Sequence, residues 1–215
     1  MIPLYVLLRR VHPATMTGII IALNAIVFLW ELIQTPYRQT LFIKHYAMVP
    51  DHLTLTSLLT SMFLHGGWMH LIGNMWFLWV FGSHIEDVMG APRFLLFYLS
   101  CGISSAVVQL MMTLHSAIPT LGASGAIAGV MGAFLVLYPR VRVRTLIFIL
   151  IFITTIEIPA AFMLIYWFGL QLVSGLFSSG TFSDSGGTAW FAHVGGFLTG
   201  LFLIRLFPNT RRFSY

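Results

Sequence analysis

Two side chains capable of acyl-transfer chemistry stand inside long apolar stretches of this sequence. Ser124 lies in Gly122-Ala123-Ser124-Gly125-Ala126, and His193 follows about seventy residues later in another apolar run. Polar side chains inside a bilayer are costly unless they face a protein interior or a water-filled cavity, so an ionisable residue there indicates a functional site. This pair favours hydrolysis inside the membrane.

The composition assigns the chain to the membrane proteins. Hydrophobic residues make up 58% of the sequence and charged residues only 8%, whereas soluble domains carry about 25% charged residues. The net charge of +5 is accounted for by contact with anionic lipid head groups, and it requires no nucleic-acid partner. The single cysteine, Cys101, excludes a disulfide framework within the chain and a cysteine metal cluster.

Apolar runs of spanning length predict six helices in one membrane domain over residues 1–215. They cover about 17–34, 68–84, 92–114, 121–138, 157–177 and 189–207, and the first is interpreted as a retained span, not a cleaved signal peptide. The stretch 145–155 is ambiguous: we expect either a connector at the cytoplasmic side or an extension of the fifth helix. The predicted fold class is an all-α, six-helix membrane bundle.

Charge orients these helices, because Lys and Arg accumulate on the cytoplasmic side of short loops. With the N-terminus inside, nine of the eleven basic residues fall on that side. We therefore expect both termini to be cytoplasmic, in a cell (inner) membrane. The outer connection, residues 35–61, mixes aromatic and aliphatic residues with few charges, which favours an amphipathic element in the interface.

Ser124 opens a predicted helix that is too short to cross the bilayer. About fifteen residues up to Pro139 span roughly 22 Å, less than a hydrocarbon core of about 30 Å. Residues 115–122 must fill the gap as an irregular segment, buried in protein or beside a water-filled cavity. A helix N-terminus at Ser124 also offers free N–H donors for an oxyanion. Taken alone, however, a Gly-x-Ser-Gly in a membrane helix is typical of helix packing.

His193 shares a helical face with small residues that permit close packing. Gly196 and Gly200 form a small-xxx-small pattern, and Gly196 is three residues after the histidine. The fourth apolar run offers a matching surface in Gly125, Ala128, Gly129 and Gly132. Contact between the two helices would bring His193 Nε2 to Ser124 Oγ, the geometry that activates a serine.

A third polar cluster begins at His65. His70 and Asn74 are four residues apart on one helical face, and both can donate hydrogen bonds to an anionic oxygen. A metal or haem site built from His65, His70 and His193 is the alternative. No carboxylate or thiolate lies nearby in sequence and no His-Glu-x-x-His occurs, so we predict no metal.

Together these segments resemble the signatures of the rhomboid family of intramembrane serine proteases. The family carries His-x-x-x-x-His-x-x-x-Asn in its second span, Gly-x-Ser-Gly at the start of its fourth, and Ala-His-x-x-Gly-x-x-x-Gly in its sixth. The matching residues are His65, His70, Asn74, Gly122, Ser124, Gly125, Ala192, His193, Gly196 and Gly200. The resemblance runs from about residue 60 to residue 205.

The resemblance implies a six-helix bundle with a serine–histidine dyad and no cofactor. Ser124 would be the nucleophile and His193 the general base, later the acid. His70, Asn74 and the backbone N–H of Ser124 would bind the oxyanion, while His65 would brace the outer loop. The substrates would be transmembrane segments of other membrane proteins, cut near their outer end at small residues.

Two departures from the family pattern leave details open. The position one turn after the serine, aromatic in many relatives, is Ala128, so another group must orient His193, with Tyr138, Trp190 and a water as candidates. The Trp-Arg pair common in the first outer loop is missing from residues 35–61.

Lateral access is expected at the fifth span, near Trp167 and Phe168. The loop from Phe177 to Thr188 would be a mobile cap or an ordinary flexible turn.

Two rival classes remain. Rhomboid-like pseudoproteases bind and escort membrane clients without cutting them, but typically lack the serine or the histidine. A transporter or channel would show paired ionisable residues along a path and a repeat between halves, and neither is visible.

Overall fold

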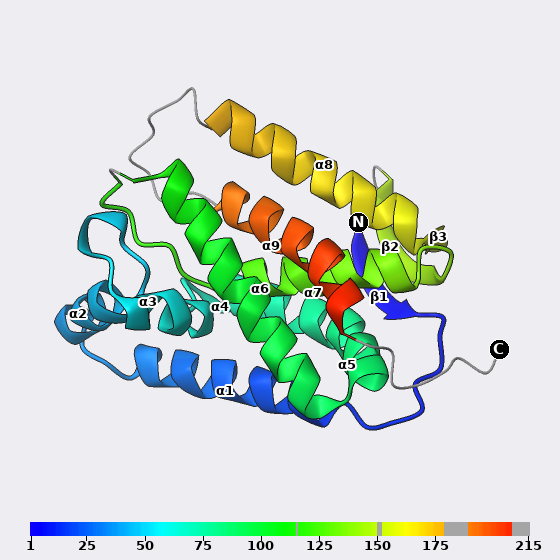
Figure 1. The fold of residues 1–215 in the computed structure, drawn as a ribbon, viewed down its shortest axis with the longest axis horizontal. Helices are drawn as coiled ribbons and strands as arrows, with labels where there is room; N and C mark the ends of the chain where they lie inside the picture. Colours follow the sequence, from blue (N-terminus) through cyan, green and yellow to red (C-terminus); the bar gives the residue numbers. More distant parts are fainter. Residues whose placement is uncertain (115, 150–151, 179–188, 208–215) are drawn as a thin grey trace.

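The computed structural model describes residues 1–114, 116–149, 152–178 and 189–207, and most of its regular structure is helical (Figure 1). The α-helices are α1 (Thr15–Leu32), α2 (Pro36–Tyr46), α3 (Leu55–Thr60), α4 (Trp68–Phe77), α5 (Ser83–Met89), α6 (Ala91–Met112), α7 (Ser124–Leu137), α8 (Ala160–Ser178) and α9 (Trp190–Leu203). A π-helical segment, Leu78–Gly82, joins α4 to α5, and the strands are β1 (Ile2–Val6), β2 (Arg142–Ile149) and β3 (Phe152–Pro159).

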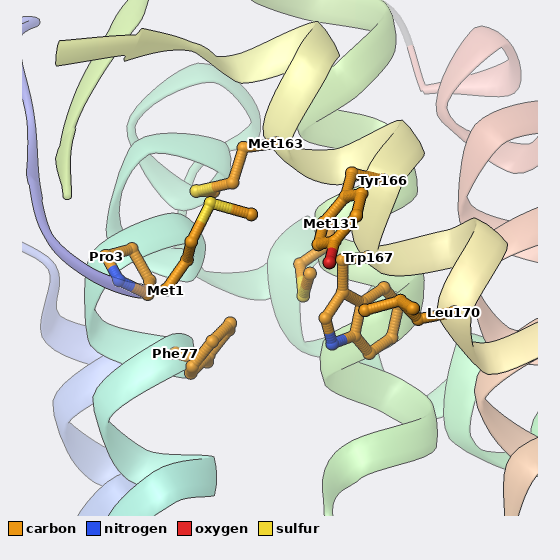
Figure 2. Close-up of a pocket in the computed structure, with 8 residues that line it drawn as sticks. All are labelled: Met1, Pro3, Phe77, Met131, Met163, Tyr166, Trp167 and Leu170. Atoms are coloured by element: carbon orange, nitrogen blue, oxygen red, sulfur yellow. The ribbon is translucent and has the colours of Figure 1, made fainter. Parts of the chain in front are cut away.

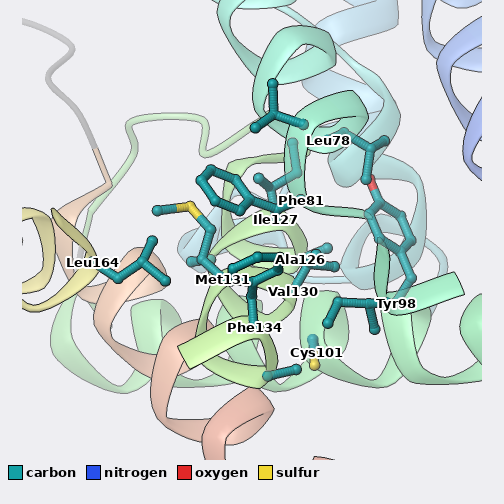
Figure 3. Close-up of a cluster of buried hydrophobic side chains, with 14 of the residues drawn as sticks. Leu78, Phe81, Tyr98, Cys101, Ala126, Ile127, Val130, Met131, Phe134 and Leu164 are labelled. Atoms are coloured by element: carbon teal, nitrogen blue, oxygen red, sulfur yellow. The ribbon is translucent and has the colours of Figure 1, made fainter. Parts of the chain in front are cut away.

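Helix α7 is enclosed by its neighbours. The ten consecutive residues from Gly125 to Phe134 are buried. Figure 3 shows the apolar side chains that meet around this helix. They come from the π segment, α6 and α8 and include Leu78, Phe81, Tyr98, Cys101 and Leu164. Over this stretch α7 therefore presents no side to lipid.

Close backbone contact joins α7 to α9. A methyl group added at Gly196 would overlap the carbonyl oxygen of Gly125, and one added at Gly200 would overlap that of Gly129. Gly132 meets the α9 backbone one turn further on. The small-residue surfaces identified in the sequence thus face each other, and only glycine permits this separation.

Within the described residues, three helices are long and apolar enough to cross a bilayer, namely α1, α6 and residues 160–177 of α8. Helix α7 has 14 residues, which span about 21 Å, and α9 has the same length. Each of the six segments expected from the sequence contains a helix. The number of crossings stays a prediction.

Two helices begin three residues later than the approximate spans expected from the sequence. The fourth helix begins at Ser124 and not at residue 121, and the fifth begins at Ala160 and not at residue 157. Residues 121–123 belong to the irregular segment before α7, and Pro159 ends a strand. Ser124 is therefore the first residue of its helix, as the sequence predicted.

The expectation of an all-α chain was also wrong, because a three-stranded antiparallel sheet closes one end of the bundle. The strand order is β1-β2-β3, and β2 and β3 form a hairpin. Residues 145–149 and 152–155 therefore lie in strands and do not extend the fifth helix. Their Ile, Phe and Thr residues favour a pleated, half-buried surface.

The sheet has a buried and a charged side. Val143 and Ile158, paired across β2 and β3, are buried. Arg144 and Glu157 are also paired, and their side chains approach to 3.0 Å. Apolar burial fixes the hairpin register, because a one-residue slip would expose the inward-facing side chains.

Acidic side chains of α5 hold the start of α1. The carboxylate of Glu86 accepts hydrogen bonds from the N–H groups of Met16 and Thr17 and from the Thr17 hydroxyl, each at 2.7 Å. These donors lie in the first turn of α1, where the helix offers no acceptor and its dipole favours an anion. Glu86 thus replaces a local cap, since Ala14 provides none.

The next residue, Asp87, ties the segment before α1 to α5. It accepts hydrogen bonds from the N–H groups of Val11 and His12 at 3.0 Å. Burial acts to raise the pKa of Asp87, but these bonds and the His12 side chain outweigh it and lower the pKa below its ordinary value. The carboxylate is therefore retained as an anion that anchors this segment.

The outer connection, residues 35–61, carries α2 and α3 at the end of the bundle opposite the sheet (Figure 1). Helix α2 has no buried residue, which is compatible with the interfacial element that the sequence predicts. Met48 and Thr120 exchange backbone hydrogen bonds of 3.0 and 2.8 Å. This pairing anchors the outer connection to the irregular segment before α7, where no Trp-Arg pair is present to do so.

The glycine seam between α7 and α9, formed by Gly125, Gly129, Gly196 and Gly200, predicts that adding one methyl group there causes a large loss of stability. Gly196→Ala should lower the free energy of unfolding by about 2 kcal/mol or more, because the added carbon overlaps backbone that cannot rotate away. Thermal unfolding of the purified variant and of the unmodified protein in detergent would measure this loss of stability. Gly18→Ala in α1 is the control, because its added carbon meets nothing within 4 Å. Equal midpoints for the two variants would contradict the seam.

Candidate active site

Ser124 stands at the first position of α7, after a sharp change in backbone direction. Gly122 has φ +119°, a conformation that side chains rarely adopt, and its N–H donates to the Ser61 carbonyl at 2.9 Å. The first N–H groups of α7 have no acceptor within the helix. Ser124 Oγ therefore lies beside several backbone donors and the positive end of a helix dipole.

His193 lies opposite Ser124 on α9 and contacts it directly. The distance between His193 Nε2 and Ser124 Oγ is 2.7 Å. The histidine is 7% exposed, so this bond forms in a largely water-free setting. The contact follows from the glycine seam, because Ser124 precedes Gly125 and His193 is three residues before Gly196. The hydrogen bond predicted from the sequence is therefore present in the structure.

The other ring nitrogen of His193 has a partner that sequence reasoning missed. Gln171 Oε1, on α8, lies 2.7 Å from His193 Nδ1, and this glutamine is buried. A signal was present, since Gln171 is a polar residue in an otherwise apolar run and polar side chains in spans face the protein interior.

Two tryptophans complete the surroundings of His193. The ring of Trp167 lies at 5.8 Å, inclined by 36°. Trp190, one of the residues that the sequence suggested, meets the ring edge-on at 6.3 Å. Tyr138, another of those suggestions, instead packs against Phe134 at the far end of α7. Aromatic rings of α8 and α9 thus contact the histidine, although position 128 of α7 carries no aromatic side chain.

His70 and Asn74 approach the start of α7 from α4. A carbon added at Gly122 would lie 2.7 Å from His70 Nε2 and 3.6 Å from Asn74 Nδ2. The N–H of Gly66 donates to His70 Nδ1 at 3.4 Å, which leaves the proton of a neutral ring on Nε2. Gly122 therefore lets two donors approach the residues that precede Ser124.

His65 lies behind these donors. Its Nε2 atom is 3.0 Å from Asn74 Nδ2, and its ring is 5.1 Å from that of His70. His65 is buried. The structure thus places it against the side chain of Asn74, a contact that the predicted role in bracing the outer loop did not include.

A small cavity of about 20 Å³ adjoins Ser124. It is bounded by the irregular segment before α7 and by the faces of α6, α7 and α9. Most of its walls come from small side chains, including Gly102, Ser105, Ala106, Ala126 and Ala192.

A larger cavity of about 190 Å³ opens between β1, α4, α7 and α8 (Figure 2). Figure 2 shows Trp167 and Leu170 of α8 on one side and Phe77 of α4 across from them. Trp167, which lines this cavity, also contacts the ring of His193. The cap predicted at residues 177–188 falls outside the described residues from 179 onward.

The fold and site together define a helical membrane protein in which a half-buried serine is hydrogen-bonded to a buried histidine. The family model of the rhomboid domain matches residues 52–209. This chain belongs to the rhomboid family, and the family resemblance seen in its motifs is confirmed.

Three relatives illustrate the similarity. The presenilin-associated rhomboid-like protein, mitochondrial, of Bos taurus is 33% identical over 194 residues, covering 88% of this chain and 48% of that protein. Rhomboid protein 1, mitochondrial, of Saccharomyces cerevisiae is 31% identical over 145 residues, 65% of this chain and 41% of that protein. Rhomboid protease GluP of Bacillus subtilis is 42% identical over 78 residues, 36% of this chain and 15% of that protein. The chain thus spans less than half of each relative's length.

Gly122 should be intolerant of a side chain, because both its backbone conformation and His70 oppose one. We expect Gly122→Ala to lower the free energy of unfolding by about 1–3 kcal/mol. Gly66→Ala is the control, since its added carbon makes only ordinary contacts of 3.8 and 3.9 Å. Differential scanning fluorimetry of both variants would test this, and a midpoint for Gly122→Ala equal to the control would refute the tight fit.

Proposed function

We propose that this chain is an intramembrane serine endopeptidase that cleaves transmembrane segments of other membrane proteins. The observation that carries the proposal is the 2.7 Å contact between Ser124 Oγ and His193 Nε2 inside an apolar helix bundle. Membership of a family that includes a Bacillus subtilis protein named as a rhomboid protease supports it.

Ser124 acts as the nucleophile and His193 as the proton carrier. His193 Nε2 takes the hydroxyl proton as Ser124 Oγ bonds to the carbonyl carbon of the scissile peptide, and then gives this proton to the leaving amine. The resulting ester is hydrolysed by water, whose proton passes to the same nitrogen and returns to Ser124 Oγ. No cofactor enters either half of the reaction.

The negative charge that develops on the carbonyl oxygen is stabilised by donors on two sides. His70 Nε2 and Asn74 Nδ2 approach from α4, and the N–H of Ser124 projects from the start of α7. An amide NH₂ carries two protons, so Asn74 can keep its contact with His65 and still donate to the oxyanion. His65 then holds Asn74 in place while it acts.

The two cavities suit a peptide substrate that arrives within the bilayer. The small cavity beside Ser124 would take a small side chain at the cleaved bond, because glycine, serine and alanine form most of its walls. The larger apolar cavity between α4 and α8 would receive part of the transmembrane segment. Lateral approach past α8 would bring the segment to this cavity, because α8 forms one of its walls.

We further propose six crossings, with both termini on the cytoplasmic side. Arg142 and Arg144 lie in the sheet that closes one end of the bundle, and β1 near the N-terminus belongs to the same sheet. Ser124 begins its helix at the other end, which becomes the outer side under the positive-inside rule. The proposed location is a cell (inner) membrane. Fractionation of cells that express the tagged chain would distinguish this location from a mitochondrial membrane.

Removal of the nucleophile tests the function. Ser124→Ala should abolish cleavage of a reporter transmembrane substrate and labelling by a fluorophosphonate, with little change in thermal midpoint, because only one hydroxyl is lost. Ser104→Ala is the matched control, since it removes a serine hydroxyl of α6 that also contacts α9, at 2.7 Å from Thr199 Oγ1. If the unmodified protein neither cleaved nor was labelled, an escort role without catalysis would replace the proposal.

Asn74 tests the oxyanion site. Loss of one preset donor lowers the catalytic rate by about 10²–10³-fold in serine hydrolases, so Asn74→Ala should lower kcat by that factor and change KM little. Steady-state cleavage of the reporter in detergent measures both constants. Asn24→Ala, which removes a buried asparagine of α1, should leave kcat unaltered. A raised KM with unchanged kcat would assign Asn74 to substrate binding.

A further inference from the structure

We infer that Gln171 is a positioning residue for His193, and that it makes the orientation of the catalytic base depend on the docking of α8. The inference rests on the proposed function, because it concerns the histidine proposed as base. Gln171 supplies the neutral third member of a serine–histidine–glutamine chain, and it comes from a helix that carries neither of the other two residues.

The geometry links three helices through two short hydrogen bonds. Ser124 on α7 and Gln171 on α8 lie on opposite sides of the His193 ring, each at 2.7 Å from a different ring nitrogen. Gln171 and His193 are both 7% exposed. A buried imidazole with both nitrogens paired is held in one ring orientation, because any rotation would break one of the bonds.

The amide oxygen also selects the tautomer. A neutral imidazole carries one proton, so one nitrogen donates and the other accepts. With Oε1 of Gln171 at Nδ1, the proton resides on Nδ1, and the lone pair on Nε2 faces the Ser124 hydroxyl. This is the tautomer that a base requires. In the opposite tautomer Nε2 would donate to Ser124 and could not remove its proton.

A glutamine performs this task without placing a second charge in the bundle. A carboxylate at the same place would hold the same tautomer, but burial of an anion carries a desolvation cost. The described residues place no carboxylate in hydrogen-bond contact with His193. The amide therefore supplies the fixed acceptor that a carboxylate supplies in a serine–histidine–aspartate triad.

The position of Gln171 follows from how α8 packs on α9. Phe168 stacks on Phe197 at 4.7 Å with 25° between the rings, and Trp167, four residues before Gln171, lies against His193. One turn beyond Gln171, the face at Gly175 meets Trp190 and Phe191. These contacts lie on one face of α8, so Gln171 reaches His193 only while that face is docked.

Access of a substrate past α8 therefore has a consequence for the base. A hydrogen bond of 2.7 Å is lost once its partners separate by about 1 Å. When α8 moves outward to admit a transmembrane segment, Gln171 withdraws from His193, and the ring is released. The base regains its orientation only after α8 has closed, which links peptide attack to completed substrate binding.

Three variants separate this role from simple packing. Gln171→Leu removes the acceptor at similar volume, and we expect a 10- to 100-fold lower kcat and slower fluorophosphonate labelling, with KM little changed. Gln171→Glu restores an acceptor and should recover most of the labelling rate. Leu172→Ala, on the exposed side of α8, is the control and should label at the rate of the unmodified protein.

A spectroscopic measurement tests the tautomer without turnover. In protein carrying Ser124→Ala, ¹⁵N NMR of the His193 ring should show the proton on Nδ1, and the addition of Gln171→Leu should shift the population toward Nε2. A ring protonated on Nε2 while Gln171 is present would overturn the inference. Labelling of Gln171→Leu at the unmodified rate would overturn it as well.

The same experiment distinguishes two kinds of failure. If the unmodified protein is neither labelled nor active, the proposed function fails, whereas normal activity in Gln171→Leu refutes the positioning role alone. If Gln171→Leu and Gln171→Glu lose labelling equally and both unfold at lower temperature, Gln171 is a packing residue and the inference is wrong.

Discussion

The structure depends on the close approach of two helix backbones, α7 and α9. Gly125 and Gly129 face Gly196 and Gly200 with no room for a methyl group. This separation determines where Ser124 and His193 lie, because each is within one turn of a glycine in the seam. In lipid, where apolar side chains gain little by leaving their surroundings, such contact supplies van der Waals energy that larger residues would prevent. The active-site geometry is thus a consequence of backbone packing.

The remaining polar groups follow from that arrangement. A helix end inside an apolar bundle leaves N–H groups that must find acceptors. Glu86 provides them for α1, and Gln109 Oε1 accepts from the N–H of Ala192 in the first turn of α9. At α7 the first backbone N–H groups lie beside Ser124, at the candidate active site. The starts of α1 and α9 are therefore satisfied by side chains from neighbouring helices, whereas Ser124 stands at the start of α7.

Much of this site could be predicted from the sequence, because its elements are local. The sequence alone shows three of its features: the spacing of the glycines, the four-residue interval between His70 and Asn74, and a helix too short to cross the bilayer. The sheet was missed because an apolar run rich in Ile and Phe fits a buried strand as well as a helix, and hydropathy does not separate them. Gln171 was missed for a different reason. Its polarity indicates that it faces the protein interior, but its partner there depends on how α8 packs on α9, which the sequence of α8 does not encode.

The enclosure of α7 also bears on how the chain is built into a membrane. Membrane insertion selects segments by their hydrophobicity while they are still surrounded by lipid. In the folded protein, however, α7 is surrounded by protein atoms along most of its length. The apolar side chains of α7 therefore favour its insertion into lipid, although in the folded protein these side chains contact other protein atoms. Since α9 follows it in the chain by more than fifty residues, the glycine face of α7 stays uncovered by α9 until those residues have been synthesised and α9 has docked.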